Sequence, residues 1–325
     1  MSKVSMIIPV YNSEKYLKES LDCLVNQTLK DIEIIIVDDC SSDNSPSIIK
    51  DYMSRYSNIK YYRNDKNRGP GYSRNIGIGM ASGEYIGFMD SDDLIDLSML
   101  EAMYSGAISN NKPDLITCGI KFLEPNTVYK QGDMYIDKGR IIDNNNNPDN
   151  IIFSSPSCCN KLFKRDLIGN DRFLEGCMWE DFAFSFSMLI KANKVLEFSN
   201  NLYVYRKDID NGISSRAYKN TSPIEDTFRI GKYLEDSAIL CDKYDVYKDV
   251  IKLLQISVCL ERLSEIKCWN VSEEEKKERM ISLYKETCDR YGNIDDVDKA
   301  LLSSRVDIML IDKIKEMINK KGKSI

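Results

Sequence analysis

The stretch Gly83-Glu84-Tyr85-Ile86-Gly87-Phe88-Met89-Asp90-Ser91-Asp92-Asp93 joins an apolar run to a cluster of acidic residues. The apolar part predicts a buried strand, and three carboxylates follow it within four residues. Carboxylates this close repel one another, so we expect a positive group among them. A Mg²⁺ or Mn²⁺ ion suits such oxygen ligands and usually shares its coordination shell with substrate phosphates. The alternative interpretation is a solvated acidic turn that caps the following helix.

The composition is that of an ordinary globular protein. The chain has 325 residues, of which 42% are hydrophobic and 30% are charged. Its net charge of -6 argues against a general nucleic-acid-binding protein. It begins without a signal-peptide pattern, and no apolar run reaches the roughly 18 residues that a membrane span needs. We therefore expect a cytoplasmic protein whose ten cysteines are reduced thiols.

The chain contains no histidine. This excludes Ser-His-Asp and Cys-His catalysis and any histidine metal site. Proton transfer must then fall to carboxylate, lysine, tyrosine or cysteine side chains, and the acidic clusters are the leading candidates.

Strands and helices alternate along the first 120 or so residues, as expected for a parallel sheet covered by helices on both faces. We predict strands at 4–10, 32–37, 59–62, 84–89 and 115–120, with helices at 45–56, 71–81 and 98–110 and another beginning near residue 13. Asp38-Asp39 follows one strand and Asp90-Ser91-Asp92-Asp93 follows another. Because ligands in such sheets bind beyond the carboxyl ends of the strands, the two acidic patches should meet at one edge.

The rest of the chain divides into two kinds of sequence. Residues 124–150 are polar and predict an irregular, flexible loop. From about Pro223 the pattern becomes that of amphipathic helices, the last of them at 305–321 with lysines near its end. We place the domain boundary between residues 218 and 219, which gives an α/β domain followed by a helical domain.

Neither a complete Gly-x-Gly-x-x-Gly motif nor a P-loop is present, so dinucleotide and P-loop sites are not expected. A further acidic pair, Glu180-Asp181, follows Trp179. A carboxylate beside aromatic residues can become a usable base through desolvation. Taken alone, however, this pair is more typical of an exposed helix start, with Asp181 capping the helix.

The motifs taken together resemble those of the family 2 glycosyltransferases. The matching blocks occur in the expected order and cover roughly residues 1–215: Pro9-Val10-Tyr11-Asn12, Val37-Asp38-Asp39-Cys40-Ser41-Ser42-Asp43, Asn67-Arg68-Gly69 with Ser73-Arg74-Asn75, Gly83-Glu84-Tyr85-Ile86, Asp90-Ser91-Asp92-Asp93, Asn160-Lys161-Leu162-Phe163 and Glu180-Asp181.

The resemblance implies a GT-A fold and inverting transfer of a sugar from a nucleotide-diphosphate donor, most often a UDP-hexose or UDP-N-acetylhexosamine, to a glycan or lipid-linked acceptor in surface polysaccharide or glycoconjugate synthesis. It implies a role for each matching residue: Pro9, Tyr11, Asp39, Arg74 and Ser91 in the nucleotide site, Asp90 towards the ribose, Asp92 as the direct ligand of Mn²⁺ or Mg²⁺, Asp181 as the base and Glu180 as a support for the acceptor.

Two positions depart from the family pattern. Many relatives carry a histidine near the diphosphate after the Tyr205-Arg206 element, and Arg206 or Lys207 could replace it here. Cys40 stands where glycine is common, and we expect it to be tolerated.

Other functions stay open. A catalytically silent glycosyltransferase-like partner subunit is one alternative, and a sugar nucleotidyltransferase is another, although the latter would need a glycine-rich N-terminal loop. The basic last helix could contact an anionic membrane surface, which would place the protein at the inner face of the cell membrane. Ordinary packing of that helix on the catalytic domain is the simpler expectation.

Overall fold

The structure, a computed structural model, describes residues 2–124, 127, 129, 136–207 and 224–292. The chain divides into two compact units, Met1–Lys207 and Asp208–Ile325. The predicted boundary at 218/219 and the predicted helix at 305–321 lie outside the described residues.

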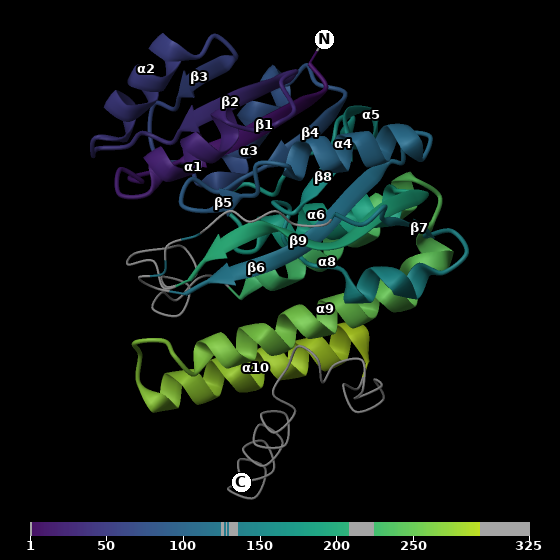
Figure 1. Cartoon of the computed structure of the whole chain (residues 1–325). Coiled ribbons are helices and arrows are strands. Elements are labelled where there is room, and N and C mark those ends of the chain that lie inside the picture. The colour runs from purple at the N-terminus through teal and green to yellow at the C-terminus, as the bar shows by residue number, and fades with distance from the viewer. Residues whose placement is uncertain (1, 125–126, 128, 130–135, 208–223, 293–325) are drawn as a thin grey trace, which may run out of the picture. The chain divides into compact units, whose positions relative to one another are not determined.

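The described residues of the first unit form a nine-stranded sheet in the order β3-β2-β1-β4-β8-β6-β9-β5, with β7 paired to β9 (Figure 1). Its strands are β1 (Val4–Val10), β2 (Ile32–Asp38), β3 (Ile59–Arg63), β4 (Tyr85–Phe88), β5 (Leu94–Ile95), β6 (Leu115–Leu123), β7 (Arg140–Asp143), β8 (Lys161–Lys164) and β9 (Lys194–Arg206). Strands β3, β2, β1 and β4 are parallel, whereas β8 is antiparallel to both β4 and β6. The predicted α/β class with a mostly parallel sheet is confirmed.

The helices of this unit are α1 (Leu17–Val25), α2 (Ser45–Arg55), α3 (Pro70–Met80), α4 (Met99–Ser109), α5 (Arg165–Ile168), α6 (Glu180–Lys191) and the 3-10 helix η1 (Pro148–Phe153). Helix α3 packs against β1 and β2, and Gly77 permits this close approach. A Cβ atom at Gly77 would lie 2.3 Å from Cγ2 of Ile7. The packing therefore fixes the height of α3 above the sheet, and with it the place of Arg74.

The two acidic patches lie at the same edge of the sheet. Strands β2 and β4 flank β1 and run parallel to it, with Asp38 opposite Val10 and Phe88 opposite Ile7. Every residue of β2 is buried, including Asp38. The carboxyl ends of these strands thus bring Asp38-Asp39 and the Asp90–Asp93 turn together, as expected from their spacing.

The prediction of an irregular loop for 124–150 was wrong for residues 140–143, which form β7, and for residues 148–150, which begin η1. Strand β7 pairs antiparallel with the first four residues of β9. An ion pair between Arg140 and Glu197 joins the two strands. A charged, half-exposed edge strand of this kind has no apolar alternation, so its sequence looks like a loop.

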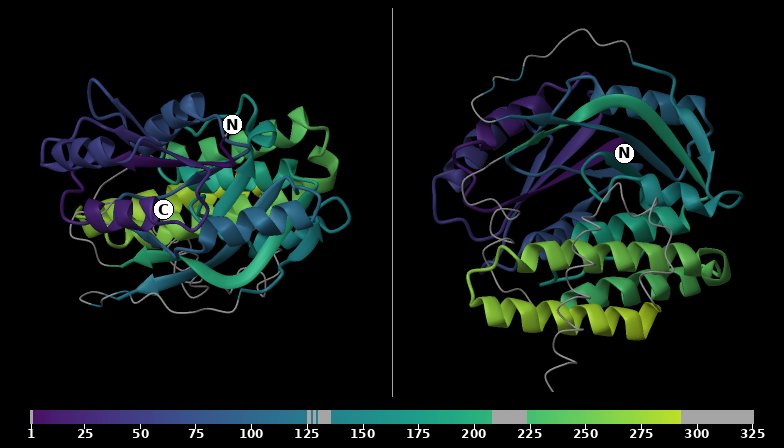
Figure 2. Two further views of the ribbon diagram at one scale, coloured as in Figure 1. Left: turned by 45° about the horizontal axis from the view of Figure 1, so that its top comes forward. Right: turned by 90° about the horizontal axis from the view of Figure 1, so that it is seen from below.

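The described part of the second unit, residues 224–292, contains three helices that lie side by side (Figure 2): α8 (Glu225–Leu240), α9 (Tyr244–Ile266) and α10 (Glu273–Tyr291). Buried residues including Phe228, Leu260 and Trp269 form its core. Ser272 caps the start of α10, since its Oγ accepts a hydrogen bond from the Glu275 amide. Among the described residues, no helix is both long and apolar enough to cross a membrane.

A buried carboxylate connects strands β1, β2 and β3 near their amino ends, opposite to the two acidic patches. Glu33 on β2 accepts hydrogen bonds from Ser5 Oγ at 2.5 Å and from the Ser82 amide at 2.6 Å, and it pairs with Lys60 at 2.6 Å. Burial alone would raise the pKa of Glu33, but Lys60 and the hydrogen bonds from Ser5 and Ser82 hold it at about 2.

We predict that Glu33→Gln lowers the free energy of unfolding by about 3 kcal/mol at pH 7. The folded pKa of Glu33 lies below its unfolded value, so its contribution is complete above about pH 4.5 and is lost as the pH falls towards 2. Urea unfolding at pH 7 and pH 3.5 would measure the difference. The exposed Glu101→Gln is the control, and an equal effect of both changes would contradict the assignment.

Candidate functional site

A buried arginine connects the two acidic elements of the site. Arg74 on α3 donates from Nη2 to Asp90 Oδ1 at 2.7 Å and from Nη1 to Glu180 Oε1 at 2.6 Å. Its side chain is 5% exposed, and its guanidinium lies 5.4 Å from the centre of the Phe173 ring. A buried arginine with two carboxylate partners fixes both of them, because either one left unpaired would be costly. Arg74 thus places the turn after β4 beside the start of α6.

The turn after β4 contains one carboxylate that no other described side chain binds. Asp90 is held by Arg74, and the Ser91 hydroxyl lies 2.6 Å from that of Ser13. Asp92 forms no side-chain hydrogen bond or ion pair with any described residue. Burial, followed by the neighbouring Asp90 carboxylate, raises the pKa of Asp92 to about 6. Of the three carboxylates in this turn, Asp92 is therefore the one whose negative charge has no bound positive or hydrogen-bonding partner among the described side chains.

Asp93, the third carboxylate of the cluster, belongs to the interior. It is 1% exposed, and it accepts hydrogen bonds from the Tyr203 hydroxyl at 2.5 Å and the Arg206 amide at 2.8 Å. Burial and the nearby Asp90 and Asp92 raise the pKa of Asp93 well above its usual range. Asp93 thus stays close to the other two carboxylates, as expected, but its own oxygens are engaged with β9. No local pattern marks Asp93 as different, because its partners lie on β9.

Glu180 and Asp181 begin helix α6, next to the turn. The N-cap residue is Trp179 and not Asp181, although Asp181 Oδ1 accepts a hydrogen bond from the Phe182 amide at 2.9 Å. The helix start is not exposed as its sequence alone suggested, since Glu180 is buried. Trp179 has a positive φ of 57°, an uncommon backbone conformation for a bulky residue, which is often found at functional sites. Burial raises the pKa of Glu180 to about 7 and also raises that of Asp181, with Arg74 opposing both shifts. Both side chains can therefore take up a proton more readily than an exposed carboxylate.

The second acidic patch, Asp38-Asp39, holds the segment that follows β3 in place. Asp38 Oδ2 pairs with Arg63 at 2.9 Å, and both oxygens of Asp39 accept bonds from the segment 64–69, including the Gly69 amide at 2.8 Å. Asp39 is 3% exposed, so its carboxylate is already engaged. The next residue, Cys40, has a φ of 64°, which explains why glycine suits this position.

Pro9 and Tyr11 lie where β1 ends, between the two patches. Tyr11 is 38% exposed, and the neighbouring Asn12 amide donates to Ser41 Oγ at 3.1 Å. The structure thus brings all nine predicted site residues to the carboxyl-end edge of the sheet or the adjacent start of α6. Their individual roles towards a nucleotide remain predictions.

The residues near Asp92 fit a cation that is shared with a substrate. No group of three or more Asp, Glu, Cys or His side chains in the described part of the chain could hold a metal ion by itself. The open carboxylate of Asp92 and the second oxygen of Asp90 are hard ligands of the kind that Mg²⁺ and Mn²⁺ prefer. Such an ion would need further oxygen atoms from water or from a phosphate group.

Arg206 and Lys207, the two cations expected to replace the missing histidine, are each paired with a glutamate of this chain. Arg206 donates to the Asp92 carbonyl at 2.9 Å and pairs with Glu19 at 2.7 Å. Lys207 pairs with Glu124 at 2.8 Å. Residues 208 to 216, which follow these two cations, lie outside the described part of the chain.

A fully buried lysine, Lys161, holds the loop that precedes β8. Lys161 on β8 donates to the carbonyls of Ser155 and Ser157, each at 2.7 Å, and to Asn160 Oδ1 at 3.0 Å. Burial lowers the pKa of Lys161 to about 8. It fixes the loop that precedes β8. The sequence placed it in a motif but gave no reason for its burial.

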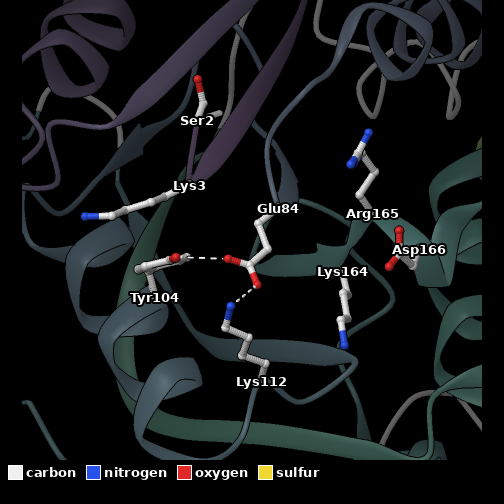
Figure 3. Close-up of a pocket in the computed structure, with 8 residues that line it drawn as sticks. All are labelled: Ser2, Lys3, Glu84, Tyr104, Lys112, Lys164, Arg165 and Asp166. Carbon is white, nitrogen blue, oxygen red and sulfur yellow. Dashed lines mark hydrogen bonds and ion pairs between the residues drawn. The ribbon is translucent and has the colours of Figure 1, made fainter.

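A hollow of about 350 Å³ at the opposite edge of the sheet carries several charges but does not form a second site (Figure 3). Glu84 at its centre is paired with Lys112 at 2.7 Å and accepts a hydrogen bond from Tyr104 at 3.0 Å. Figure 3 shows Lys164 and Arg165 pointing away from each other, so these two cations do not converge on one ligand.

Comparisons with known proteins agree with this geometry. The family model "Glycosyl transferase family 2" matches residues 5–170, just over half of the chain. The chain is 32% identical over 66% of its length to glycosyltransferase GlyA of Streptococcus pneumoniae. It is 34% identical over 66% of its length to a poly(ribitol-phosphate) beta-glucosyltransferase of Bacillus spizizenii. The matched segments span only 32% and 34% of those relatives, so the chain resembles a part of each.

Solved structures share the fold. S. aureus TarS 1-349 in complex with UDP-GlcNAc superimposes with a TM-score of 0.67 at 24% identity, covering 88% of this chain and 80% of the other. A mannosyltransferase from Pyrobaculum calidifontis, solved with GDP-Man and Mn²⁺, gives a TM-score of 0.50 at 14% identity, covering 89% and 83%. At these identities the likeness shows a common GT-A fold.

We predict that Arg74→Met lowers the free energy of unfolding by about 3 kcal/mol at pH 8, because it leaves Glu180 and Asp90 without their cation. The loss should be smaller at pH 5. Burial raises the pKa of Glu180 and Arg74 opposes that shift, so the folded variant would hold the Glu180 proton more tightly than the unfolded chain does, and its stability falls as the pH rises. Urea unfolding at the two pH values would measure this.

Arg55→Met, which breaks an exposed pair with Asp51, is the matched control and should change stability by less than about 1 kcal/mol at either pH. If Arg74→Met had the same small effect, the bridge would not hold the site together.

Proposed function

The chain belongs to glycosyl transferase family 2, and on that premise we propose that it transfers a sugar from a UDP-linked donor to an acceptor hydroxyl with inversion at the anomeric carbon. The observation that carries the proposal is the Arg74 bridge. The single buried guanidinium of Arg74 binds both the Asp90-Ser91-Asp92 turn and the Glu180-Asp181 pair, so these two elements lie side by side. One element can then face the leaving group while the other faces the acceptor.

UDP is the nucleotide best supported by the comparisons. Two of the similar structures are TarS complexes named for UDP-GlcNAc and UDP, whereas the more distant mannosyltransferase complex is named for GDP-Man. The donor sugar would be a hexose or an N-acetylhexosamine, since similar proteins are named as glucosyl- and N-acetylglucosaminyltransferases.

On the donor side, Asp92 and the free oxygen of Asp90 would hold Mn²⁺ or Mg²⁺ together with the diphosphate. A bound divalent cation would offset the negative charge that develops on the leaving UDP. Ser91, Tyr11 and Pro9 would line the nucleotide pocket. Asp39 would act mainly through the segment 64–69, because its two oxygens already bind that segment.

On the acceptor side, Asp181 would accept the proton of the hydroxyl whose oxygen attacks the anomeric carbon. Burial raises the pKa of Asp181, which makes it a stronger base than an exposed aspartate. Glu180, fixed by Arg74, would orient the acceptor. Attack from the side opposite to UDP breaks the bond to the leaving oxygen and inverts the anomeric carbon.

The acceptor would be a glycan, a polyol phosphate or a lipid-linked precursor of a surface polymer. Similar proteins include a minor teichoic acid biosynthesis protein of Bacillus subtilis and a cholesterol galactosyltransferase of Borreliella burgdorferi, so acceptors differ widely among relatives. We place the reaction in the cytoplasm, where nucleotide sugars are available, with the inner membrane face as the site of a lipid-linked acceptor.

We predict that Asp92→Ala weakens UDP binding in the presence of Mn²⁺ at least tenfold and leaves binding without metal unchanged, because only the metal-dependent contact is removed. Calorimetric titration with UDP and GDP, each with and without Mn²⁺, would test this. The exposed Asp31→Ala is the control. Equal UDP affinity in Asp92→Ala and wild type would exclude Asp92 as a metal ligand.

We predict that Asp181→Asn keeps UDP affinity within twofold but lowers the rate of transfer by a factor of roughly 10² to 10⁴, since the base is lost and the shape is kept. The rate is measured as UDP release from a panel of UDP-hexoses and UDP-N-acetylhexosamines. Asp166→Asn, an exposed change on α5, should leave it unchanged. Near-normal release from Asp181→Asn would disprove the assignment of the base, whereas UDP binding without turnover of any donor by the wild type would favour a silent partner subunit.

A further inference from the structure

We propose that Tyr203, Asp93 and Arg206 form a clamp that positions the Asp90–Asp92 turn from behind, so that these three are positioning residues of the donor site. We call this group the β9 clamp, because two of its members lie at the end of β9. The inference rests on the proposed function for its effect on donor binding, but the clamp itself follows from contacts within the first unit.

Asp93 is the centre of the clamp. Its side chain is buried, and each carboxylate oxygen has a donor on β9: Tyr203 Oη at 2.5 Å for Oδ2 and the Arg206 amide at 2.8 Å for Oδ1. A buried carboxylate with both oxygens satisfied has one stable orientation. The residue that ends the turn is therefore fixed to a strand more than a hundred positions further along the chain.

Tyr203 connects both ends of the turn through one oxygen atom. Its ring is 1% exposed, and its hydroxyl donates to Asp93 and accepts from the Asp90 amide at 3.4 Å. The pairing of β5 with β9 holds the chain directly after the turn, with Leu94 opposite Val204. The hydroxyl of Tyr203 thus spans the acidic turn from its first to its last residue.

Arg206 fixes the residue in the middle. Its Nε donates to the Asp92 carbonyl at 2.9 Å, and its side chain, 13% exposed, pairs with Glu19 and lies 4.8 Å from the centre of the Tyr16 ring. With these partners, the guanidinium faces the backbone of the turn. Its contribution to the donor site is to hold the Asp92 carbonyl, which leaves the Asp92 carboxylate as the open group.

Helix α1 holds the turn from its other side. Ser20 Oγ lies 2.9 Å from the carbonyl oxygen of Ser91 and 2.7 Å from that of Asp93, and its single proton is shared between them. The carbonyls of residues 91, 92 and 93 therefore all lie within reach of a side-chain donor. A ligand placed on such a turn is preorganised, and displacement of a reacting or binding group by about 1 Å is enough to cost a large part of its effect.

The test compares two buried tyrosines that lose the same atom. Tyr203→Phe removes the hydroxyl of the clamp, and Tyr85→Phe removes an equally buried hydroxyl that donates to the Pro113 carbonyl at 2.8 Å, at the opposite edge of the sheet. We measure amide hydrogen exchange of the metal-free protein in peptides that cover residues 89–93. We also measure UDP affinity in the presence of Mn²⁺ by calorimetry.

The expected result is at least tenfold faster exchange at residues 90–93 and at least tenfold weaker metal-dependent UDP binding in Tyr203→Phe, with neither change in Tyr85→Phe. Exchange at residues 90–93 that is the same in both variants would overturn the clamp. Faster exchange in a protein whose wild type binds no UDP would support the clamp and contradict the proposed function instead.

Arg206→Met provides a second test if Tyr203→Phe does not fold. It should speed exchange at residues 90–93 and weaken metal-dependent UDP binding, whereas Arg140→Met, which removes an exposed arginine paired with Glu197 near the start of β9, should do neither. Equal effects of Arg206→Met and Arg140→Met would show that the two cations act only through their charge and would overturn the positioning role of Arg206.

Discussion

The candidate site depends on a single buried cation. Arg74 binds Asp90 and Glu180 at once, and these two carboxylates come from positions 16 and 106 residues away in the chain. A guanidinium suits this task because its planar fork of N–H groups can satisfy two carboxylates in fixed directions. Helix α3 places it correctly only because Gly77 lets the helix rest on β1. The packing of a helix on a sheet thus decides the distance between the donor side and the acceptor side.

Each carboxylate of the Asp90–Asp93 turn meets a different environment, and this divides the work among them. Asp90 is paired with Arg74, Asp93 is hydrogen-bonded inside the protein, and Asp92 is left open with a pKa of about 6. Three equivalent acids would repel one another without giving any of them a particular task. Because Asp90 and Asp93 bind neighbouring elements, the uncompensated negative charge of the turn is concentrated on Asp92.

Much of the fold could be predicted from the sequence, because apolar strands alternating with amphipathic helices leave few other arrangements. The convergence of Asp38-Asp39 and Asp90–Asp92 also followed from strand direction alone. The antiparallel strands β7 and β8 and the role of Asp93 could not be predicted in this way. Their partners, such as Glu197 for Arg140 and Tyr203 for Asp93, lie far away in the chain, and local periodicity carries no information about them. The same holds for Arg74, whose motif suggested a nucleotide contact but not the bridge.

A crystal structure with UDP and Mn²⁺ bound would test the Arg74 bridge. We predict that Arg74 still bridges Asp90 and Glu180 in that complex, with the diphosphate and the ion at Asp92 and with the Asp181 carboxylate facing the place of the anomeric carbon. An Arg74 side chain that has left Glu180 to bind the diphosphate would contradict it. In that case the arginine would be a ligand of the nucleotide, and the two sides of the site would be held together by something else.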